Sequence, residues 1–205
     1  KLIDWLNTFT FPEEAKFVDK SYASAVAKFF LSETLKNGYT TSAVFCTIHP
    51  ESVEAFFSEA EMLGLRMLAG KVLMDRNAPE NVRDTAQNSY DQSKELIDKW
   101  HNRQRSLYAI TPRFAPTSTP EQLEVAATLY KENDGVYIQS RVSENVDEIT
   151  WVAELFPRAS SYLDVYNGFN LLGPRALYGH GIHFSDADIE MLKATDTSIV
   201  HCPTS

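Results

Sequence analysis

Tyr137-Ile138-Gln139-Ser140-Arg141-Val142-Ser143-Glu144-Asn145 has the pattern of a buried strand that leads to a carboxylate, that of Glu144. We expect a strand over residues 136–143 and a helix over residues 147–156, where apolar residues return at helical spacing. The same unit recurs along the chain. The expected strands are residues 40–48, 66–74, 107–114, 136–143, 176–182 and 198–202. The expected helices are residues 21–36, 50–63, 81–101, 147–156 and 185–194, with a further one that Thr119 caps and Pro120 begins.

The expected strands are continuous apolar runs, which indicates a sheet covered on both faces. Strands that alternate with helices favour a parallel sheet with crossover helices. An open doubly wound sheet and a (β/α)8 barrel both fit this pattern. No Gly-x-Gly-x-x-Gly turn follows the first strand, which weakens a dinucleotide-binding interpretation. A full barrel needs eight strands and about 250 residues. We therefore predict an α/β fold in one domain, residues 1–205, namely a TIM barrel whose first and last strands are missing from this chain.

The composition is that of an ordinary globular domain, with 43% hydrophobic and 23% charged residues. A net charge of -9 argues against a broad nucleic-acid surface. No apolar run reaches the roughly 20 residues of a membrane span. The N-terminus lacks the pattern of a signal peptide, and two cysteines give no disulfide framework, so we expect a cytoplasmic protein. The chain lacks an initiator Met and stops just after a strand, so we expect a piece of a larger protein.

Active sites of parallel α/β folds lie at the carboxyl ends of the strands. Glu144 and His180 lie at such ends and are the candidates for proton transfer or, for His180, metal binding. Taken alone, Glu144 is better explained as a cap of the following helix, whereas His180 is explained equally well as a structural histidine. Arg113 offers donors in a fixed fork, and Phe114 offers a ring face for a flat ligand. The alternative is an Arg paired with a carboxylate and a core Phe.

Other polar residues at strand ends have simpler explanations. We expect His49 to cap a helix, His183 to lie at the rim and His201 to be a core histidine. Asp75 ends the second expected strand, and Cys46 is expected to be a small core residue. No complete metal-ligand cluster, nucleophile elbow or phosphate loop is present.

Several segments, in this order and spacing, resemble the guanine deaminases of the amidohydrolase superfamily, and the resemblance runs through the whole chain. They are Trp5-Leu6-Asn7, Phe9, Thr10-Phe11-Pro12, Asn37-Gly38-Tyr39-Thr40-Thr41, Gly70-Lys71-Val72-Leu73-Met74-Asp75, Ile110-Thr111-Pro112-Arg113-Phe114, Val142-Ser143-Glu144-Asn145-Val146-Asp147-Glu148, Tyr178-Gly179-His180-Gly181 and His201-Cys202-Pro203-Thr204-Ser205.

The resemblance implies a TIM barrel of the metal-dependent hydrolase type, with one zinc ion, Zn(2+), that deaminates guanine to xanthine and ammonia in purine catabolism. It makes Glu144 the proton shuttle and places His180 against the attacking water or the metal. Arg113, Phe114 and Glu144 would hold the purine, and the remaining metal ligands would fall outside this chain. It also implies a homodimer, for which the residues themselves give no interface.

Arg141 departs from the family pattern, which has a zinc-binding His at this position. A guanidinium has no acceptor and stays charged, so it cannot ligate a metal. We expect Arg141 to pair with Glu144, to weaken zinc binding and to leave little deaminase activity. Two alternatives remain: an amidohydrolase that acts on another aminopurine, a pterin or a triazine, and a non-catalytic barrel used for binding.

Overall fold

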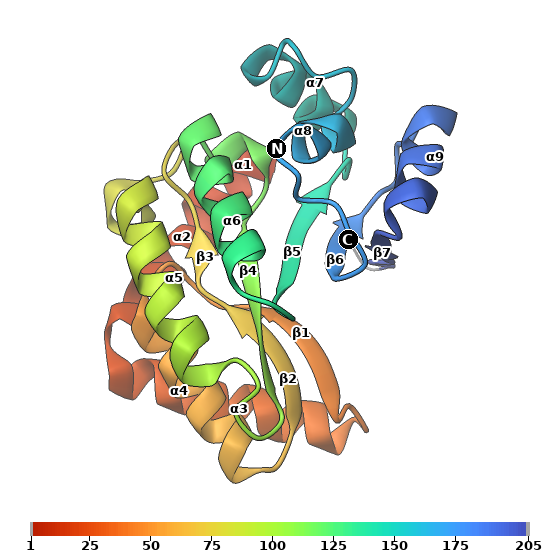
Figure 1. Cartoon of the computed structure of the whole chain (residues 1–205). Coiled ribbons are helices and arrows are strands. Elements are labelled where there is room, and N and C mark those ends of the chain that lie inside the picture. The colour runs from red at the N-terminus through yellow and green to blue at the C-terminus, as the bar shows by residue number, and fades with distance from the viewer. Residues whose placement is uncertain (1, 204–205) are drawn as a thin grey trace.

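The computed structural model describes residues 2–203, and of these the side chains from residue 4 onward. Within them, seven strands form one sheet in which every pairing is parallel. The strands are β1 (Thr41–Phe45), β2 (Arg66–Gly70), β3 (Val72–Leu73), β4 (Ser106–Pro112), β5 (Tyr137–Val142), β6 (Ala176–His180) and β7 (Ser198–Val200). Their order is β1-β2-β4-β5-β6-β7, with β3 on β4. The sheet curls into part of a barrel (Figure 1), which confirms the predicted partial TIM barrel.

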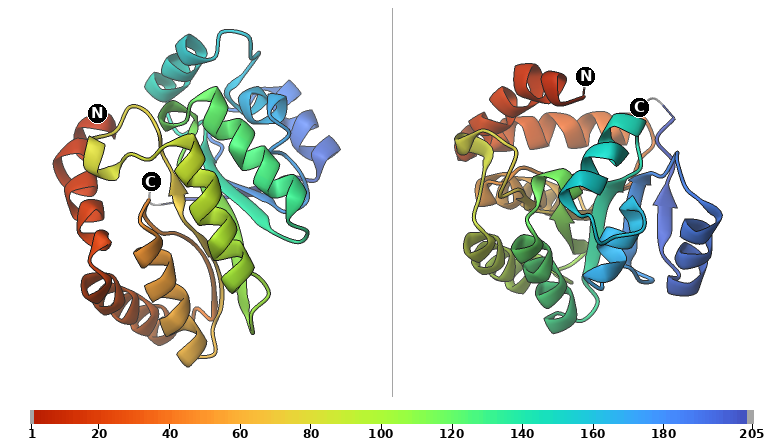
Figure 2. Two further views of the ribbon diagram at one scale, coloured as in Figure 1. Left: turned by 60° about the vertical axis from the view of Figure 1, so that its left-hand side comes forward. Right: turned by 90° about the horizontal axis from the view of Figure 1, so that it is seen from above.

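Helices cover the outside of this sheet (Figures 1 and 2). They are α3 (Lys20–Lys36), α4 (Pro50–Met62), α5 (Ala86–Trp100), α6 (Pro120–Glu132), α7 (Val146–Leu155), α8 (Tyr162–Gly168) and α9 (Asp186–Thr195). The helices from α3 to α6 pack side by side, whereas α7 and α8 lie at the carboxyl end of β5. The predicted Thr119 cap is confirmed, because its hydroxyl accepts from the Gln122 N–H. Ser185 begins α9 with a capping box that includes Asp188.

The N-terminal residues form a chain of short helical turns that the sequence patterns did not predict. They are α1 (Leu2–Trp5), the π-helical η1 (Leu6–Thr10), α2 (Phe11–Glu14) and the 3-10 turn η2 (Ala15–Val18). Leu6 and Phe11 from these turns are buried in a small apolar cluster with Phe114 and Met74. The N-terminal turns are therefore anchored beside the carboxyl ends of β3 and β4.

Several other elements also differ from the predictions. The expected strand 66–74 is split at Lys71 into β2 and β3. Next to the break, Gly70 packs so closely on β4 that an added Cβ would lie 1.8 Å from the Ala109 carbonyl oxygen. The region of the expected helix 81–101 forms the 3-10 turn η3 (Glu80–Val82) and the shorter helix α5. Thr85 caps α5, because its hydroxyl accepts from the Asn88 N–H. A further 3-10 turn, η4 (Ala115–Thr117), follows β4, and α8 was not predicted.

A buried ion pair fixes the segment before α5. The Lys71 ammonium donates to the Asp84 carboxylate, and the two side chains are 0% and 7% exposed. Burial lowers the pKa of Lys71, and the Asp84 charge opposes that shift. The Asp84 N–H also donates to the Met74 carbonyl at 2.7 Å. Lys71 therefore ties the end of β2 to the helical layer.

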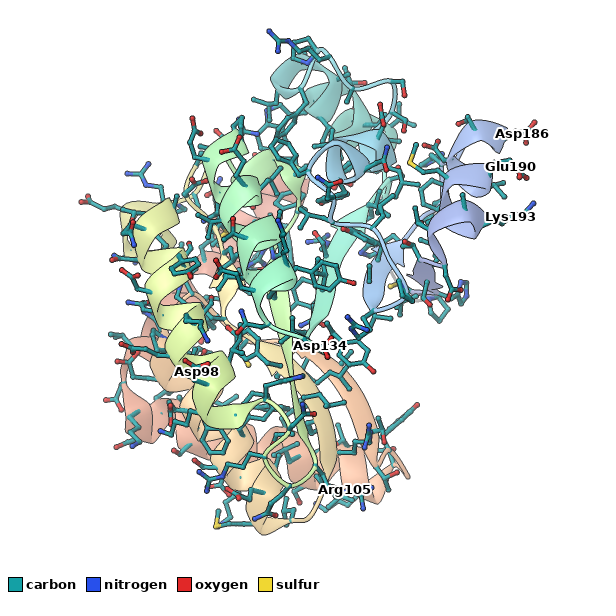
Figure 3. The ribbon with its side chains drawn as sticks, in the orientation of Figure 1. Asp98, Arg105, Asp134, Asp186, Glu190 and Lys193 are labelled. Carbon is teal, nitrogen blue, oxygen red and sulfur yellow. The ribbon has the colours of Figure 1, made fainter. Side chains whose placement is uncertain are left out.

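The main core lies between the sheet and the helices. Phe57 of α4 and Trp100 of α5 stack with ring centroids 5.5 Å apart. Tyr166 and Tyr178 fill the layer between α8 and β6. Charged side chains of α9, such as those of Glu190 and Lys193, point to solvent (Figure 3). No helix within the described part of the chain has the length and apolar character to cross a bilayer.

Candidate functional site

A cavity of about 390 Å³ opens at the sheet beside the carboxyl ends of β4, β5 and β6. Its lining residues are Glu14, Ala43, Phe45, Cys46, Arg113, Gln139, Ser140, Arg141, Leu177, Gly179, His180, Val200 and Cys202. The structure thus brings Arg113, Arg141 and His180 to one cavity. The strands involved are distant in the sequence: residues of β4 and β5 that share a hydrogen bond are 28 positions apart, and those of β5 and β6 are 39 positions apart. A cavity with a few convergent polar groups is a candidate binding site.

Arg141, Glu144 and His180 form one connected cluster. Arg141 donates through Nη2 to the Glu144 carboxylate and through Nε to His180 Nε2 at 3.3 Å. Glu144 Oε2 lies 3.5 Å from the same imidazole nitrogen. The three side chains are only 18%, 14% and 9% exposed. The predicted pairing of Arg141 with Glu144 is therefore present.

The imidazole of His180 is neutral in this arrangement. A guanidinium only donates, so His180 Nε2 must accept and the ring proton must sit on Nδ1. Burial lowers the pKa of His180, and Arg141 lowers it further, whereas Glu144 raises it. Nδ1 is buried and makes no hydrogen bond within the described residues. His180 also has a φ of +75°, an unusual backbone conformation for a non-Gly residue.

Buried groups of α7 and α8 hold the loop that carries Glu144. The Glu148 carboxylate accepts from the Glu144 N–H at 3.2 Å and from the Tyr162 hydroxyl at 2.8 Å. Burial raises the pKa of Glu148. Asn145, not Glu144, caps α7 by accepting from the Glu148 N–H at 2.9 Å. The capping explanation of Glu144 is therefore wrong, and its side chain is directed to the cluster instead.

The Tyr166 hydroxyl joins the ends of β4 and β5. It donates to the Arg141 carbonyl and accepts from the Ala115 N–H, both at 2.9 Å, and lies 2.9 Å from the Ser140 hydroxyl. Tyr166 is fully buried. The backbone of Arg141 is thus fixed by a group that does not depend on the Arg141 side chain.

Arg113 is held from the N-terminal turns. Its Nη1 donates to both oxygens of Glu14, at 2.7 and 2.8 Å, and its guanidinium lies 5.3 Å from the centre of the Phe11 ring. Phe114 is fully buried, lies edge-on to Trp151 and has the Arg141 guanidinium 5.4 Å above its ring. Phe114 does not line the cavity in this structure.

Gln139 is a site residue that the sequence analysis overlooked, because only polar residues at the carboxyl ends of strands were considered. It lies within β5, and its Nε2 donates to the Val44 carbonyl at 2.9 Å and to the Thr111 hydroxyl at 3.0 Å. A glutamine within the strand, next to Ile138, was the available signal. Gln139 ties the interiors of β1, β4 and β5 together beneath the cavity.

The other candidates lie outside the cluster. His49 precedes α4, but its side chain makes no capping hydrogen bond, so that prediction is wrong. His201 follows β7 and is exposed, so it is not a core histidine. His183 is exposed, as expected for a rim residue. The Asp75 carboxylate accepts from the N–H and hydroxyl of Thr119, which gives it a structural role.

Cys46 lines the cavity, and burial raises the pKa of its thiol to about 12, so it is no thiolate nucleophile near neutral pH. Among residues 2–203, no group of three or more His, Cys, Asp and Glu side chains is placed to hold a metal ion. Residues 204 and 205, which end the His201-Cys202-Pro203-Thr204-Ser205 motif, lie outside the described residues.

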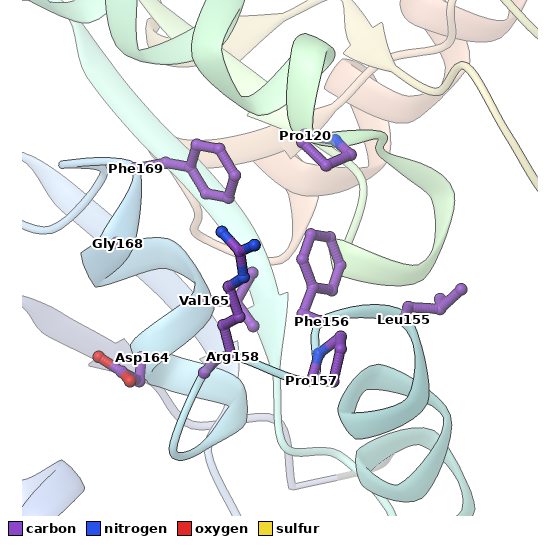
Figure 4. A pocket seen from close by; sticks show the side chains of 10 residues that line it. Pro120, Leu155, Phe156, Pro157, Arg158, Asp164, Val165, Gly168 and Phe169 are labelled. Atoms are coloured by element: carbon purple, nitrogen blue, oxygen red, sulfur yellow. The ribbon is translucent and has the colours of Figure 1, made fainter.

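A second hollow of about 530 Å³ lies between the start of α6 and the segment that joins α7 to α8 (Figure 4). Figure 4 shows Arg158 among mainly apolar side chains such as Phe156 and Phe169. This hollow is the larger of the two. It shares no lining residue with the Arg141 cavity and lacks its convergent hydrogen-bonding groups. We therefore place the candidate site at the smaller cavity.

Comparison with known proteins gives consistent matches along the chain. Guanine deaminase of Escherichia coli strain K12 is 48% identical over 205 residues, which cover 100% of this chain and 47% of that protein. Its structure superposes with a TM-score of 0.98 over the same shares of the two chains. Guanine deaminase of C. acetobutylicum, solved with guanine bound in the active site, is 35% identical with a TM-score of 0.94, over 100% of this chain and 49% of that chain.

A triazine hydrolase of Arthrobacter aurescens has a TM-score of 0.88 over 98% of this chain and 47% of that chain, but its 19% identity shows only a shared fold. This chain spans about half the length of the curated relatives that it matches. The family model described as the amidohydrolase family matches residues 1–205, so the chain belongs to the amidohydrolase family.

Proposed function

We propose that the complete protein binds guanine and catalyses its hydrolytic deamination to xanthine and ammonia, a step of purine catabolism. The observation that carries the proposal is the cavity at the strand ends, where Arg113, Arg141 and His180 converge. The identity of the whole chain to guanine deaminase of E. coli supports it, as does the match to a relative that holds guanine in its active site.

Arg113 is the proposed binding group for the carbonyl oxygen of the purine. Its guanidinium is fixed by Glu14, and its Nε is buried with no hydrogen-bond partner among residues 2–203. A buried donor without a partner is costly, and a ligand oxygen would satisfy it. We expect the Phe114 ring to stack on the purine, as the family resemblance implies. In this structure the ring lies under Arg141, so stacking requires the guanidinium to move away.

Glu144 is the proposed proton carrier. Deamination requires that a water lose a proton, that a ring nitrogen gain one, and that the leaving amine be protonated. A carboxylate that is 14% exposed, close to a neutral imidazole, suits both the acceptance and the release of a proton. His180 is the proposed residue that orients the water, because its buried Nδ1 proton has no acceptor among the described residues. Arg141 restrains both groups in this structure.

Zinc is the expected metal, but the described residues do not fit it. Residues 2–203 contain no group of three or more ligand side chains in reach of one ion. Because the resemblance places the remaining ligands outside this chain, the misfit lies at Arg141. Arg141 instead places a guanidinium against His180 and Glu144, the two side chains closest to the proposed chemistry. A fixed cation opposes a second cation at the same place. We therefore propose weak zinc binding and low turnover for this protein.

The second candidate is a barrel that binds guanine without hydrolysing it, which the Arg141 contacts favour. The two are separated by incubating the complete protein with guanine, following xanthine by absorbance, and measuring guanine binding by calorimetry. Xanthine formation that the Glu144→Gln variant abolishes supports the deaminase, and binding without xanthine supports the second candidate. A protein that binds no guanine refutes both. Turnover of an aminopurine, pterin or triazine instead would indicate a related amidohydrolase. The cytoplasmic location and the homodimer stay predictions.

A further inference from the structure

We propose that Glu14 is a positioning residue that orients Arg113 for a carbonyl oxygen of the ligand, an inference that rests on the proposed function. Glu14 lies at the end of α2, 99 residues before Arg113 in the chain. Both of its carboxylate oxygens accept from one nitrogen, Nη1, at 2.7 and 2.8 Å. The carboxylate therefore holds one end of the guanidinium fork.

The contact is sheltered from water, which makes it stronger than a surface ion pair. The side chains of Arg113 and Glu14 are 10% and 15% exposed. Phe11 lies under the guanidinium, with its ring centre at 5.3 Å, and is itself 1% exposed. One turn of α2 thus supplies both a carboxylate and a ring face to Arg113.

Both partners line the cavity that also contains Arg141 and His180. Because Nη1 is occupied by Glu14, a ligand must use the other donors of Arg113. Nε is one such donor, since it is buried and has no hydrogen-bond partner among residues 2–203. A guanidinium anchored at one nitrogen presents its remaining donors in a fixed direction, which favours recognition of a planar carbonyl.

The neighbouring Glu13 provides a matched control. It lies on the same short helix, but its side chain is 59% exposed and pairs with Lys16 at 2.7 Å. Hydrogen bonds from Lys16 and Tyr22 lower the pKa of Glu13, and neither partner belongs to the cavity. A Glu→Gln change at either position removes one negative charge, but only Glu14 contacts Arg113.

The test compares Glu14→Gln, Glu14→Asp and Glu13→Gln in the complete protein. Dissociation constants are measured for guanine and for 2-aminopurine, which lacks the ring carbonyl. Loss of a charge-assisted hydrogen bond corresponds to about a tenfold change in affinity. We expect Glu14→Gln to weaken guanine binding by about tenfold or more and to leave 2-aminopurine within about twofold. Glu14→Asp should retain part of the discrimination, and Glu13→Gln should match the wild type.

Three results would overturn the proposal. Equal guanine affinity in Glu14→Gln and Glu13→Gln would show that Arg113 does not need the carboxylate. If Glu14→Gln weakened the binding of guanine and of 2-aminopurine equally and also lowered the unfolding midpoint, Glu14 would have only a structural role. A wild-type protein that binds neither ligand would remove the proposed function, and with it this inference. This last result differs from the other two because it appears before any variant is made.

Discussion

The replacement Arg141→His tests the proposed cause of weak metal binding. The guanidinium makes a charge-assisted hydrogen bond to Glu144 and a second hydrogen bond to His180 Nε2. These contacts correspond to about 1.5–3 and about 0.5–1.5 kcal/mol respectively. With side chains at most 18% exposed, solvent screening reduces these values little. A metal that recruits this cluster must break both contacts, at a cost of about 2–4.5 kcal/mol.

A cost of this size corresponds to about a 30-fold to 2,000-fold loss of metal affinity. We expect Arg141→His in the complete protein to gain at least the lower factor in zinc affinity and to gain guanine turnover. The assay is zinc content per chain after dialysis against buffers of set free zinc concentration. Arg141→Lys keeps the cation and should stay poor in zinc, whereas Arg141→Met removes the cation without supplying a ligand and should fall between the two.

Two results would refute the reasoning. Wild-type protein with one tightly bound zinc per chain and normal turnover would show that Arg141 does not obstruct the site. Equal zinc affinity in Arg141→His and Arg141→Lys would show that neither the cation nor the missing imidazole limits binding. A gain of zinc should also raise the unfolding midpoint of Arg141→His, because a metal that binds only the folded state stabilises it.

Other parts of the structure give further predictions. Asp84→Asn should lower the free energy of unfolding by about 3–5 kcal/mol, since it leaves Lys71 buried without its charge partner. In urea unfolding, the double variant Lys71→Met/Asp84→Leu should lose less stability than the sum of the losses in Lys71→Met and Asp84→Leu. Tyr166→Phe should lower the free energy of unfolding by about 1–3 kcal/mol in the same assay, because it leaves the buried groups bonded to the hydroxyl without a hydrogen-bond partner. An unchanged unfolding midpoint would exclude this role. Burial lowers the pKa of His101 below its usual 6.5, so the unfolded state binds the proton more readily and the stabilisation present above about pH 6.5 is lost as the pH falls. His101→Gln should therefore flatten the fall in unfolding midpoint between about pH 7 and pH 5, and a slope equal to wild type would contradict this.

The parallel sheet was predictable because each strand carries its own signals. An apolar run and the cap that follows it, such as the segment that leads to Thr119 and Pro120, can be recognised from the local sequence alone. The split at Lys71 was not predictable in this way. It lies beside the close approach of Gly70 to the Ala109 carbonyl, a contact between strands that local pattern cannot reveal.

The missed helix α8 did have a local signal. Ser161 is followed three residues later by Asp164, and the Ser161 hydroxyl accepts the Asp164 N–H at 3.1 Å. This is the pattern of an N-cap, although the helix is only seven residues long. Glu14 had no such signal, because its partner Arg113 lies 99 residues away. Arg113, Glu144 and His180 were predicted because each lies at the carboxyl end of a strand, a position that can be read from the local sequence.

The frame of the site and the side chain at position 141 are held by different interactions. The Arg141 carbonyl is bound by the buried Tyr166 hydroxyl, and the Glu144 N–H is bound by Glu148. Neither contact involves the Arg141 side chain, so a guanidinium or an imidazole fits the same backbone. A TM-score of 0.98 to a guanine deaminase is therefore compatible with full activity or with its loss. Since the backbone accommodates either side chain, we expect zinc binding at this site to depend on whether position 141 supplies a lone pair or a positive charge.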